Sequence, residues 1–161
     1  RDFFLAYKKT DLAVDECLAA VFLPRPRAGR ELKVWKLSKR REDDISAVLG
    51  AFAWRLDDGR MINVRLAFGG MAGIPARALG AEAALEGKAP SVEAFAQAKD
   101  ALAQDFDPMS DVRGSATYRR HSAAALLERL RLVIARQITD GTDPLQQSVS
   151  DQEVMLHAYA H

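Results

Sequence analysis

Alternating and continuous apolar stretches in the first half of the chain predict β-strands. Residues 31–39 form a short mixed run, and residues 45–57 are apolar on both faces, which is typical of a central strand. Residues 61–68 alternate cleanly between apolar and polar positions. Asp58-Gly59 favours a two-residue hairpin turn, because such turns need positive φ. We therefore predict an antiparallel meander of three strands, extended to a fourth by the apolar run 17–23.

The alternation also predicts which side chains face the core. In the strand at 61–68, four apolar side chains are expected to point inward and Asn63 and Arg65 outward; the four are Ile62, Val64, Leu66 and Phe68. The strand at 45–57 has one face of large side chains and one of smaller ones. The smaller face consists of Ala47, Leu49, Ala51 and Ala53. This asymmetry predicts that another element packs closely against the small side.

Helical periodicity dominates the second half of the chain. Pro75 and Gly87 frame a predicted helix at 75–86. Ser91 is a good N-cap for a second helix, which ends at Asp107-Pro108. Ser115 or Thr117 begins the longest helix, which runs to about Ile138. The expected buried positions are Ile74, Ala78, Ala81 and Leu85 in the first helix, Val92, Phe95, Leu102 and Phe106 in the second, and Tyr118, Leu126, Leu127, Leu130, Val133 and Ile134 in the third.

Strands followed by helices predict an α+β fold, an antiparallel sheet of three to four strands packed against about three helices. A length of 161 residues suits one domain, with 48% hydrophobic and 28% charged residues. The stretch from Asp140 onward is polar and predicts a flexible tail.

Charge and cysteine content exclude several classes of function. Lys and Arg number 23 against 22 Asp and Glu, so nothing in the overall charge points to nucleic acid. No apolar run has the length of a membrane span. The single cysteine, Cys17, allows no disulfide within the chain, cannot supply the four ligands of an iron–sulfur cluster, and fits a reducing, cytoplasmic compartment.

Three stretches carry candidate chemistry. In residues 36–45, four cationic residues precede three acidic ones. This stretch is either a solvated charge run or the polar rim of a ligand-binding site. Residues 68–75 contain three glycines. They form either a structural turn or a place where the backbone comes close to a cofactor. Residues 105–115 are acidic and typical of a loop. Their side chains either cap and fix this loop or form a contact surface for another domain. The three histidines lack catalytic partners, so we expect no catalytic residue and no metal ligand.

These stretches together resemble the flavoprotein family of the molybdenum hydroxylases, in its xanthine dehydrogenase branch. The resemblance begins at residues 3–10 (FFLAYKKT), which look like the segment ending the family's FAD-binding domain. It continues through 39–46 (KRREDDIS), 68–72 (FGGMA), Asp105-Phe106 and 113–119 (RGSATYR). Their order and spacing agree from Phe3 to about Ala135.

The resemblance implies the C-terminal domain of an FAD-binding subunit, similar to the CO dehydrogenase flavoprotein C-terminal domain. Such a domain covers the isoalloxazine ring of FAD. The complex passes electrons from a molybdenum cofactor through [2Fe-2S] clusters and FAD to NAD during purine hydroxylation. The implied partners are the preceding FAD-binding domain and a molybdopterin-binding large subunit. An isolated chain is expected to be inactive and to hold FAD weakly.

The resemblance also implies site residues and boundaries. Ile45 would lie against the flavin face, with Asp44, Lys36 and Arg41 nearby. Ile62 stands where animal members contact FAD through a lysine, and this departure removes the polar contact. Residues 1–10 would end the preceding domain or form a linker, 11–138 would form the C-terminal domain, and 139–161 the tail.

Two other interpretations stay open. The chain could be a non-catalytic assembly module of the same fold, or it could belong to a hydroxylase of the carbon monoxide dehydrogenase or nicotine dehydrogenase type. The Arg-Arg-Glu-Asp-Asp run at 40–44 favours the xanthine branch.

Overall fold

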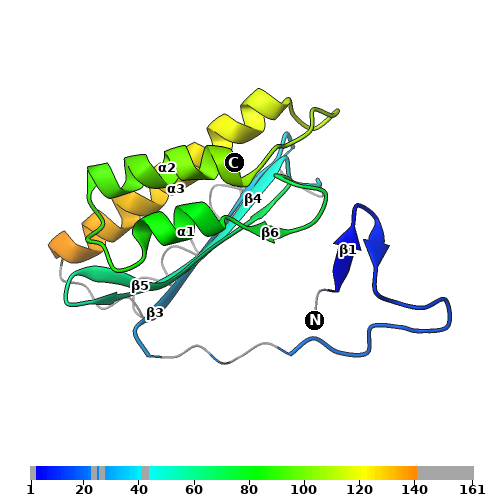
Figure 1. The fold of residues 1–161 in the computed structure, drawn as a ribbon, viewed down its shortest axis with the longest axis horizontal. Helices are drawn as coiled ribbons and strands as arrows, with labels where there is room; N and C mark the ends of the chain where they lie inside the picture. Colours follow the sequence, from blue (N-terminus) through cyan, green and yellow to red (C-terminus); the bar gives the residue numbers. More distant parts are fainter. Residues whose placement is uncertain (1–2, 23–24, 26–27, 41–43, 141–161) are drawn as a thin grey trace.

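The computed structural model describes residues 3–22, 25, 28–40 and 44–140, and within them a small hairpin and an α+β domain (Figure 1). The predicted flexible tail from residue 141 onward lies outside the described residues. In chain order the elements are β1 (Phe4–Ala6), β2 (Lys9–Thr10), β3 (Arg30–Leu37), β4 (Val48–Asp57), β5 (Arg60–Gly69), β6 (Ala76–Arg77), α1 (Leu79–Leu85), α2 (Val92–Asp105) and α3 (Ala116–Asp140).

The main sheet is an antiparallel meander in the order β3-β4-β5-β6. The predicted hairpin between β4 and β5 is confirmed, with φ of 46° at Asp58 and 71° at Gly59. Those two left-handed residues give the turn the twist that matches paired strands. The predicted fold class is thus confirmed, although the fourth strand is a different one from that expected.

Residues 17–22 form no strand, which corrects the sequence prediction for the described part of the run 17–23. Its residues 17–22 are irregular, and Phe22 is 88% exposed. Apolar character stabilises a strand only where a neighbouring edge offers hydrogen bonds and a face to bury it. This run has neither, because β4 is the only ladder partner of β3 among the described residues.

The fourth strand is β6, which lies where the sequence predicted the start of a helix at Pro75. Ala76 and Arg77 pair with Phe68 and Ala67 of β5, and α1 begins only at Leu79. The side chain of Asp105, at the end of α2, accepts hydrogen bonds from the N–H groups of Gly80 and Ala81 at 2.8 and 3.0 Å. A distant carboxylate therefore satisfies the first turn of α1, in place of the proline expected there.

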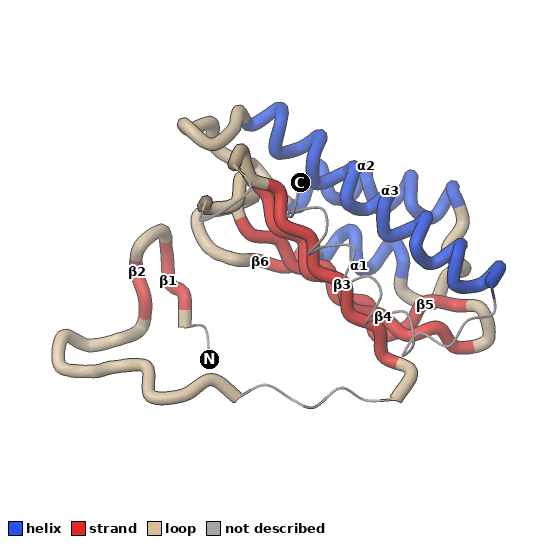
Figure 2. Tube along the Cα trace, turned by 180° about the vertical axis from the view of Figure 1, so that it is seen from behind, coloured by secondary structure: helices blue, strands red, loops and turns tan. Residues whose placement is uncertain are grey.

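All three helices cover one face of the sheet, and the hydrophobic core lies between them (Figures 1 and 2). The large side chains of β4, Phe52 and Trp54, are fully buried on this face. Gly50 precedes Phe52 on the same face of β4, and a Cβ there would stand 3.1 Å from Leu126 Cδ1 of α3. No described element covers the opposite, helix-free face, which carries the small side chains of β4.

A β-bulge at Asn63 changes the predicted phase of β5. Ala53 pairs with Arg65 and Arg55 with Ile62, so Asn63 and Val64 together oppose Trp54. Asn63 has φ of 53°, and the carboxylate of Glu86 accepts from the N–H groups of Asn63 and Val64 at 2.8 and 2.9 Å. Ile62 therefore faces the helix-free side with Arg65, not the core as predicted.

The helix boundaries follow the expected caps. Ser91 Oγ accepts from Ala94 N at 3.1 Å, and Ser115 Oγ accepts from Tyr118 N at 3.1 Å. Val92 and Tyr118 were expected in the core, yet both are exposed, in the first turns of α2 and α3. No described helix is both long and apolar enough to cross a bilayer.

Glu128 joins α2 to α3 and gives the fold an acid-sensitive contact. It pairs with Lys99 of α2 at 2.5 Å and with Arg131 at 2.6 Å. The hydrogen bond from Arg131, and then that from Lys99, lower the pKa of Glu128 to about 2 from an ordinary 4.5. A lowered folded-state pKa means that this stabilisation is present above pH 4.5 and is lost as the pH falls toward 2.

We expect Glu128→Gln to lower the free energy of unfolding at neutral pH by less than about 1 kcal/mol, since the side chain is 37% exposed and solvent screens the pairs. Urea unfolding across the acid range measures this. The difference from the wild type should vanish as the pH approaches 2. The exposed Asp100 of α2 serves as control, and Asp100→Asn should show no such pH dependence. A difference for Glu128→Gln that persisted at low pH would contradict the assignment.

Candidate functional site

Three connections meet at one end of the main sheet. They are residues 38–47 between β3 and β4, residues 70–75 between β5 and β6, and residues 106–115 between α2 and α3. The sheet register brings the first two together, because Leu37 pairs with Val48 and Leu49 with Gly69. The third reaches the same end through Lys39, whose Nζ donates to the carbonyl of Val112 at 2.9 Å. The three stretches that the sequence singled out are thus neighbours in space.

Arg119 joins these three connections. Its guanidinium donates to the carbonyl oxygens of Ala47 and Gly70, the latter at 2.8 Å, and to Asp111 Oδ1 at 2.7 Å. The side chain is 4% exposed. A charged group so far from water is tolerated because its two terminal nitrogens have acceptors, although its Nε has no hydrogen-bond partner among the described residues. We call Arg119 with Ala47, Gly70 and Asp111 the loop junction.

Gly70 is required at the loop junction by both its conformation and its surroundings. Its φ is 79°, in the region that favours glycine. A Cβ at this position would stand 2.3 Å from the carbonyl oxygen of Ala47 and 2.8 Å from Arg119 Nη1. The Gly-rich stretch is therefore a structural turn that brings two connections close together, which agrees with the first of the two sequence interpretations.

Asp111 holds the third connection in shape. Its Oδ1 accepts from the N–H groups of Arg113 and Gly114 at 2.8 and 3.1 Å as well as from Arg119. The hydrogen bond from the Arg113 N–H, followed by that from Arg119, lowers the pKa of Asp111 below its ordinary value. The carboxylate thus stays charged and paired with Arg119, and the capping interpretation of this acidic stretch is confirmed for Asp111 and Asp105.

Ile45 is presented to solvent beside the loop junction, two residues before Ala47. Its side chain is 65% exposed, unusual for an isoleucine next to two buried residues, Ala47 and Val48. Asp44 beside it lies 3.6 Å from Arg40. Burial raises the pKa of Asp44, but the charge of Arg40 and hydrogen bonds from the Arg40 and Ile45 backbone outweigh it, and the pKa lies below its ordinary value.

The other predicted site residues divide into two groups. Lys36 is exposed at the end of β3 and pairs with Leu49, so it lies at the same end of the sheet as Ile45. Arg41 lies outside the described residues. Ile62 pairs with Arg55 near the other end of β5, seven residues from Gly69, or roughly 23 Å along the strand. The structure therefore does not bring Ile62 together with Ile45.

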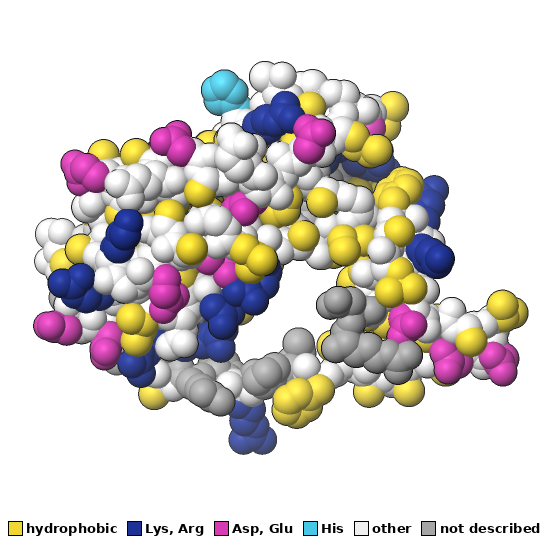
Figure 3. Space-filling model, viewed as in Figure 1, with side chains coloured by type: hydrophobic (Ala, Val, Ile, Leu, Met, Phe, Trp, Pro, Cys, Tyr) yellow, Lys and Arg dark blue, Asp and Glu magenta, His cyan; other side chains and the backbone are white. Residues whose placement is uncertain are grey.

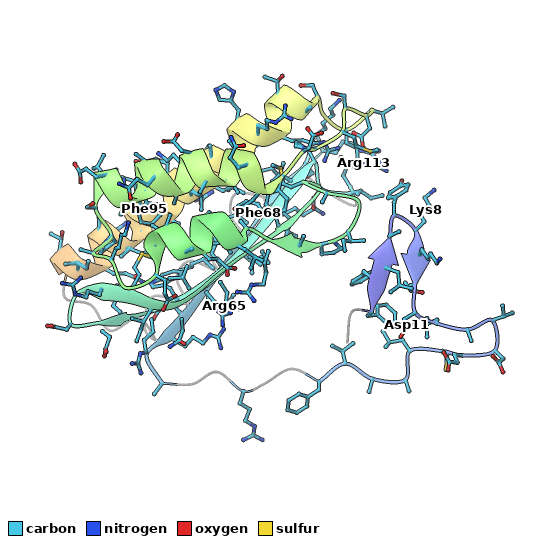
Figure 4. The ribbon with its side chains drawn as sticks, in the orientation of Figure 1. Lys8, Asp11, Arg65, Phe68, Phe95 and Arg113 are labelled. Atoms are coloured by element: carbon cyan, nitrogen blue, oxygen red, sulfur yellow. The ribbon has the colours of Figure 1, made fainter. Side chains whose placement is uncertain are left out.

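The N-terminal hairpin meets the same region from the other side of the sheet. The turn between β1 and β2 holds Tyr7 and Lys8, and a Cβ on Gly73 would stand 3.4 Å from the Cβ of Tyr7. Figure 4 shows the labelled Lys8 at the tip of this hairpin. The hairpin and the loops thus border one common surface.

The side chains present suit binding and positioning more than bond-making chemistry. The described residues contain no cluster of His, Cys, Asp and Glu able to hold a metal ion. The described histidine, His121, is exposed on α3, and Cys17 is exposed in the N-terminal segment. What the site offers is an exposed apolar side chain, flanking charges and rigidly held backbone.

The sequence analysis missed the role of Arg119, although the sequence carries a signal for it. Arg119 precedes Ala123, Leu126 and Leu130 on the buried stripe of α3 at spacings of four, seven and eleven. A cation in a buried helical position must be matched by acceptors from other elements. The position of Arg119 on the apolar stripe of α3 could therefore have predicted that it links α3 to other elements.

Comparisons with known proteins agree with this geometry. Residues 33–133 match the model of the CO dehydrogenase flavoprotein C-terminal domain. Xanthine dehydrogenase of Emericella nidulans is 34% identical over 151 residues, 91% of this chain and 11% of that protein. The medium subunit of nicotine 6-hydroxylase of Paenarthrobacter nicotinovorans is 32% identical over 130 residues, 80% of this chain and 44% of that subunit.

The solved structure of carbon monoxide dehydrogenase from Hydrogenophaga pseudoflava superposes with a TM-score of 0.74 at 32% identity. The match covers 80% of this chain and 44% of that one. The chain therefore spans less than half the length of these relatives.

Proposed function

Because this chain belongs to the CO dehydrogenase flavoprotein C-terminal domain family, we propose that it covers the isoalloxazine ring of FAD in a molybdenum hydroxylase. We call residues 36–46 and 69–77 the flavin-facing loops. FAD, when bound, supplies the redox chemistry, accepting electrons from [2Fe-2S] clusters and passing them to NAD. The residues of this chain position the ring, exclude water from it and set the charge around it.

The observation that carries the proposal is the pairing of an exposed Ile45 with a rigid loop junction directly behind it. Arg119 donates to Gly70 in one flavin-facing loop and to Ala47, the residue directly after the other, and so fixes the two loops relative to each other. An apolar side chain held out from such a support has the form needed to pack on a planar ring. Lys36 and Asp44 would border that ring, whereas Ile62, roughly 23 Å along β5 from Gly69, would meet FAD at a point away from Ile45.

We further propose the xanthine branch, with hypoxanthine or xanthine as the hydroxylated substrate, because of the Arg-Arg-Glu-Asp-Asp run at 40–44. The relatives are named for xanthine, nicotine and carbon monoxide, so the family spans several substrates. Oxidation of the substrate would take place at a molybdenum cofactor in the large subunit. The residues of this chain would act only where electrons leave through the flavin.

The proposed partners are the preceding FAD-binding domain, the molybdopterin-binding large subunit and NAD, in the cytoplasm. The proposed boundaries are residues 1–10 for the end of the preceding domain or a linker, 11–138 for this domain and 139–161 for a polar tail. The contact of Tyr7 with the loop at Gly73 supports a preceding domain that lies beside the flavin-facing loops.

The proposal is tested by Ile45→Asp in the FAD-loaded subunit. A carboxylate against the ring would be desolvated without a partner, so we expect FAD affinity or the rate of flavin reduction to fall roughly ten-fold or more. Bound FAD per subunit and NAD reduction measure the effect, and circular dichroism checks the fold.

Leu132→Asp is the matched control, because Leu132 is similarly exposed, at 54%, but lies on α3 away from the loops. It should leave FAD content and NAD reduction unchanged. If Ile45→Asp also left both unchanged, the assignment of Ile45 to the flavin would be rejected.

A further inference from the structure

Three arginines gather on the helix-free face of the sheet, at the end opposite the loop junction. Arg30 pairs with Arg55 across β3 and β4, and Arg65 of β5 pairs with Ala53, so all three project from the same face. With Ala28 and Asn63 they line a cavity of about 160 Å³. Figure 3 shows Lys and Arg side chains gathered below the helices, in the region where Figure 4 labels Arg65.

The charges in this cavity are not balanced within the described part of the chain. The carboxylate nearest to the guanidinium of Arg55 is that of Asp57, at 3.4 Å, and it is itself 64% exposed. Arg65 donates to the carbonyl of Val64 at 2.8 Å, which neutralises no charge. Among the described residues Arg30 pairs with no acid. Three cations with one acid leave a net positive charge, and like charges this close repel one another.

A buried donor without an acceptor also lies in this group. Arg55 Nε is buried and has no hydrogen-bond partner in the structure. An unsatisfied buried N–H is costly, and its cost falls when a ligand supplies an acceptor. A cavity that combines excess positive charge with an unused guanidinium donor is suited to an anion.

We propose that this cavity binds a phosphate group, as inorganic phosphate or as the monophosphate of a small molecule. Guanidinium groups present paired N–H donors that match phosphate oxygens, and several arginines can share one phosphate. The amide of Asn63 adds a neutral donor at the wall of the cavity. The small volume fits a phosphate group and its near substituents.

This site is separate from the flavin-facing loops. Arg55 lies seven residues along β4 from Val48, roughly 23 Å at the rise of an extended strand. Phosphate binding here therefore stands or falls independently of the proposed flavin role.

The test is calorimetric titration of the 161-residue chain with inorganic phosphate and with adenosine 5′-monophosphate at low salt. We expect saturable binding that weakens as salt is added, because charge attraction dominates it. Arg55→Gln and Arg65→Gln should each weaken binding roughly ten-fold, as expected for loss of a charge-assisted hydrogen bond. Arg65 is exposed, so its substitution separates binding from folding.

Arg60→Gln is the control, since Arg60 lies in the same hairpin, donates to the carbonyl of Gly87 and lines no part of the cavity. It should leave the affinity unchanged. Equal affinity for the two ligands supports a phosphate site, and tighter binding of the nucleotide supports a nucleotide monophosphate. Absence of saturable binding, equal binding of glutamate, or an equal loss in Arg60→Gln would overturn the proposal.

Discussion

Replacing Arg119 with methionine is expected to lower the free energy of unfolding by roughly 3 kcal/mol or more, because it leaves two backbone acceptors at the loop junction without their donor. The carbonyls of Ala47 and Gly70 both accept from this guanidinium. For a domain of this size such a loss lowers the melting temperature by about 10 °C. Thermal unfolding followed by circular dichroism measures it.

Arg120→Met removes the same charge from the neighbouring position and is the matched control. Arg120 pairs with the highly exposed Asp107, so its loss should change stability by less than about 1 kcal/mol. We expect the loss of stability in Arg119→Met to be accompanied by a loss of function. In the FAD-loaded subunit, Arg119→Met should also loosen the flavin-facing loops and weaken FAD binding. Equal stability of the two variants would show that Arg119 does not hold the loops together.

Gly70→Ala is expected to be comparably damaging, at roughly 3 kcal/mol or more. A left-handed conformation alone costs an alanine about 1 to 2 kcal/mol. The added Cβ would also meet the carbonyl of Ala47 at 2.3 Å and Arg119 Nη1 at 2.8 Å, so the loops must move apart. Urea unfolding gives the change in free energy.

Gly87 separates the two causes. It has φ of 73°, close to that of Gly70, but a Cβ there meets nothing within 4 Å. Gly87→Ala should therefore show only the conformational cost. If Gly70→Ala were no more destabilising than Gly87→Ala, close packing of the loops against Arg119 would be excluded as the reason for glycine at position 70.

Local signals predicted much of this fold. The Asp58-Gly59 turn, the Ser91 cap and the central strand all depend on neighbours in sequence, and the structure confirms each of them. The run 17–23 has strand-like composition but lacks a partner edge. That partner is a property of the whole sheet, and composition does not report it.

The phase of β5 and the start of α1 depended on distant residues. Glu86 satisfies the bulge at Asn63, and Asp105 satisfies the first turn of α1, each from more than 20 residues away. A period-two pattern cannot register a one-residue bulge, so Ile62 was assigned to the wrong face. Contact between Ile62 and FAD stays a prediction, at a point about 23 Å along β5 from Gly69.

For the candidate site, the sequence identified the three connections but not what unites them. Taken separately, the three stretches could be interpreted as a charge run, a turn and a capping loop, respectively. The buried position of Arg119 on α3 turns them into one support behind Ile45. Lys36 and Asp44 lie at the same end of the sheet as Ile45, and their place beside the flavin stays a prediction.

The most direct test of the central claim is a structure of the FAD-loaded subunit that contains this chain. We predict that the side chain of Ile45 lies in van der Waals contact with the isoalloxazine ring, within about 4 Å. The loop at Gly70 should lie beside the same ring. A ring bound against the helix-free face near Ala51, or distant from both flavin-facing loops, would contradict the account.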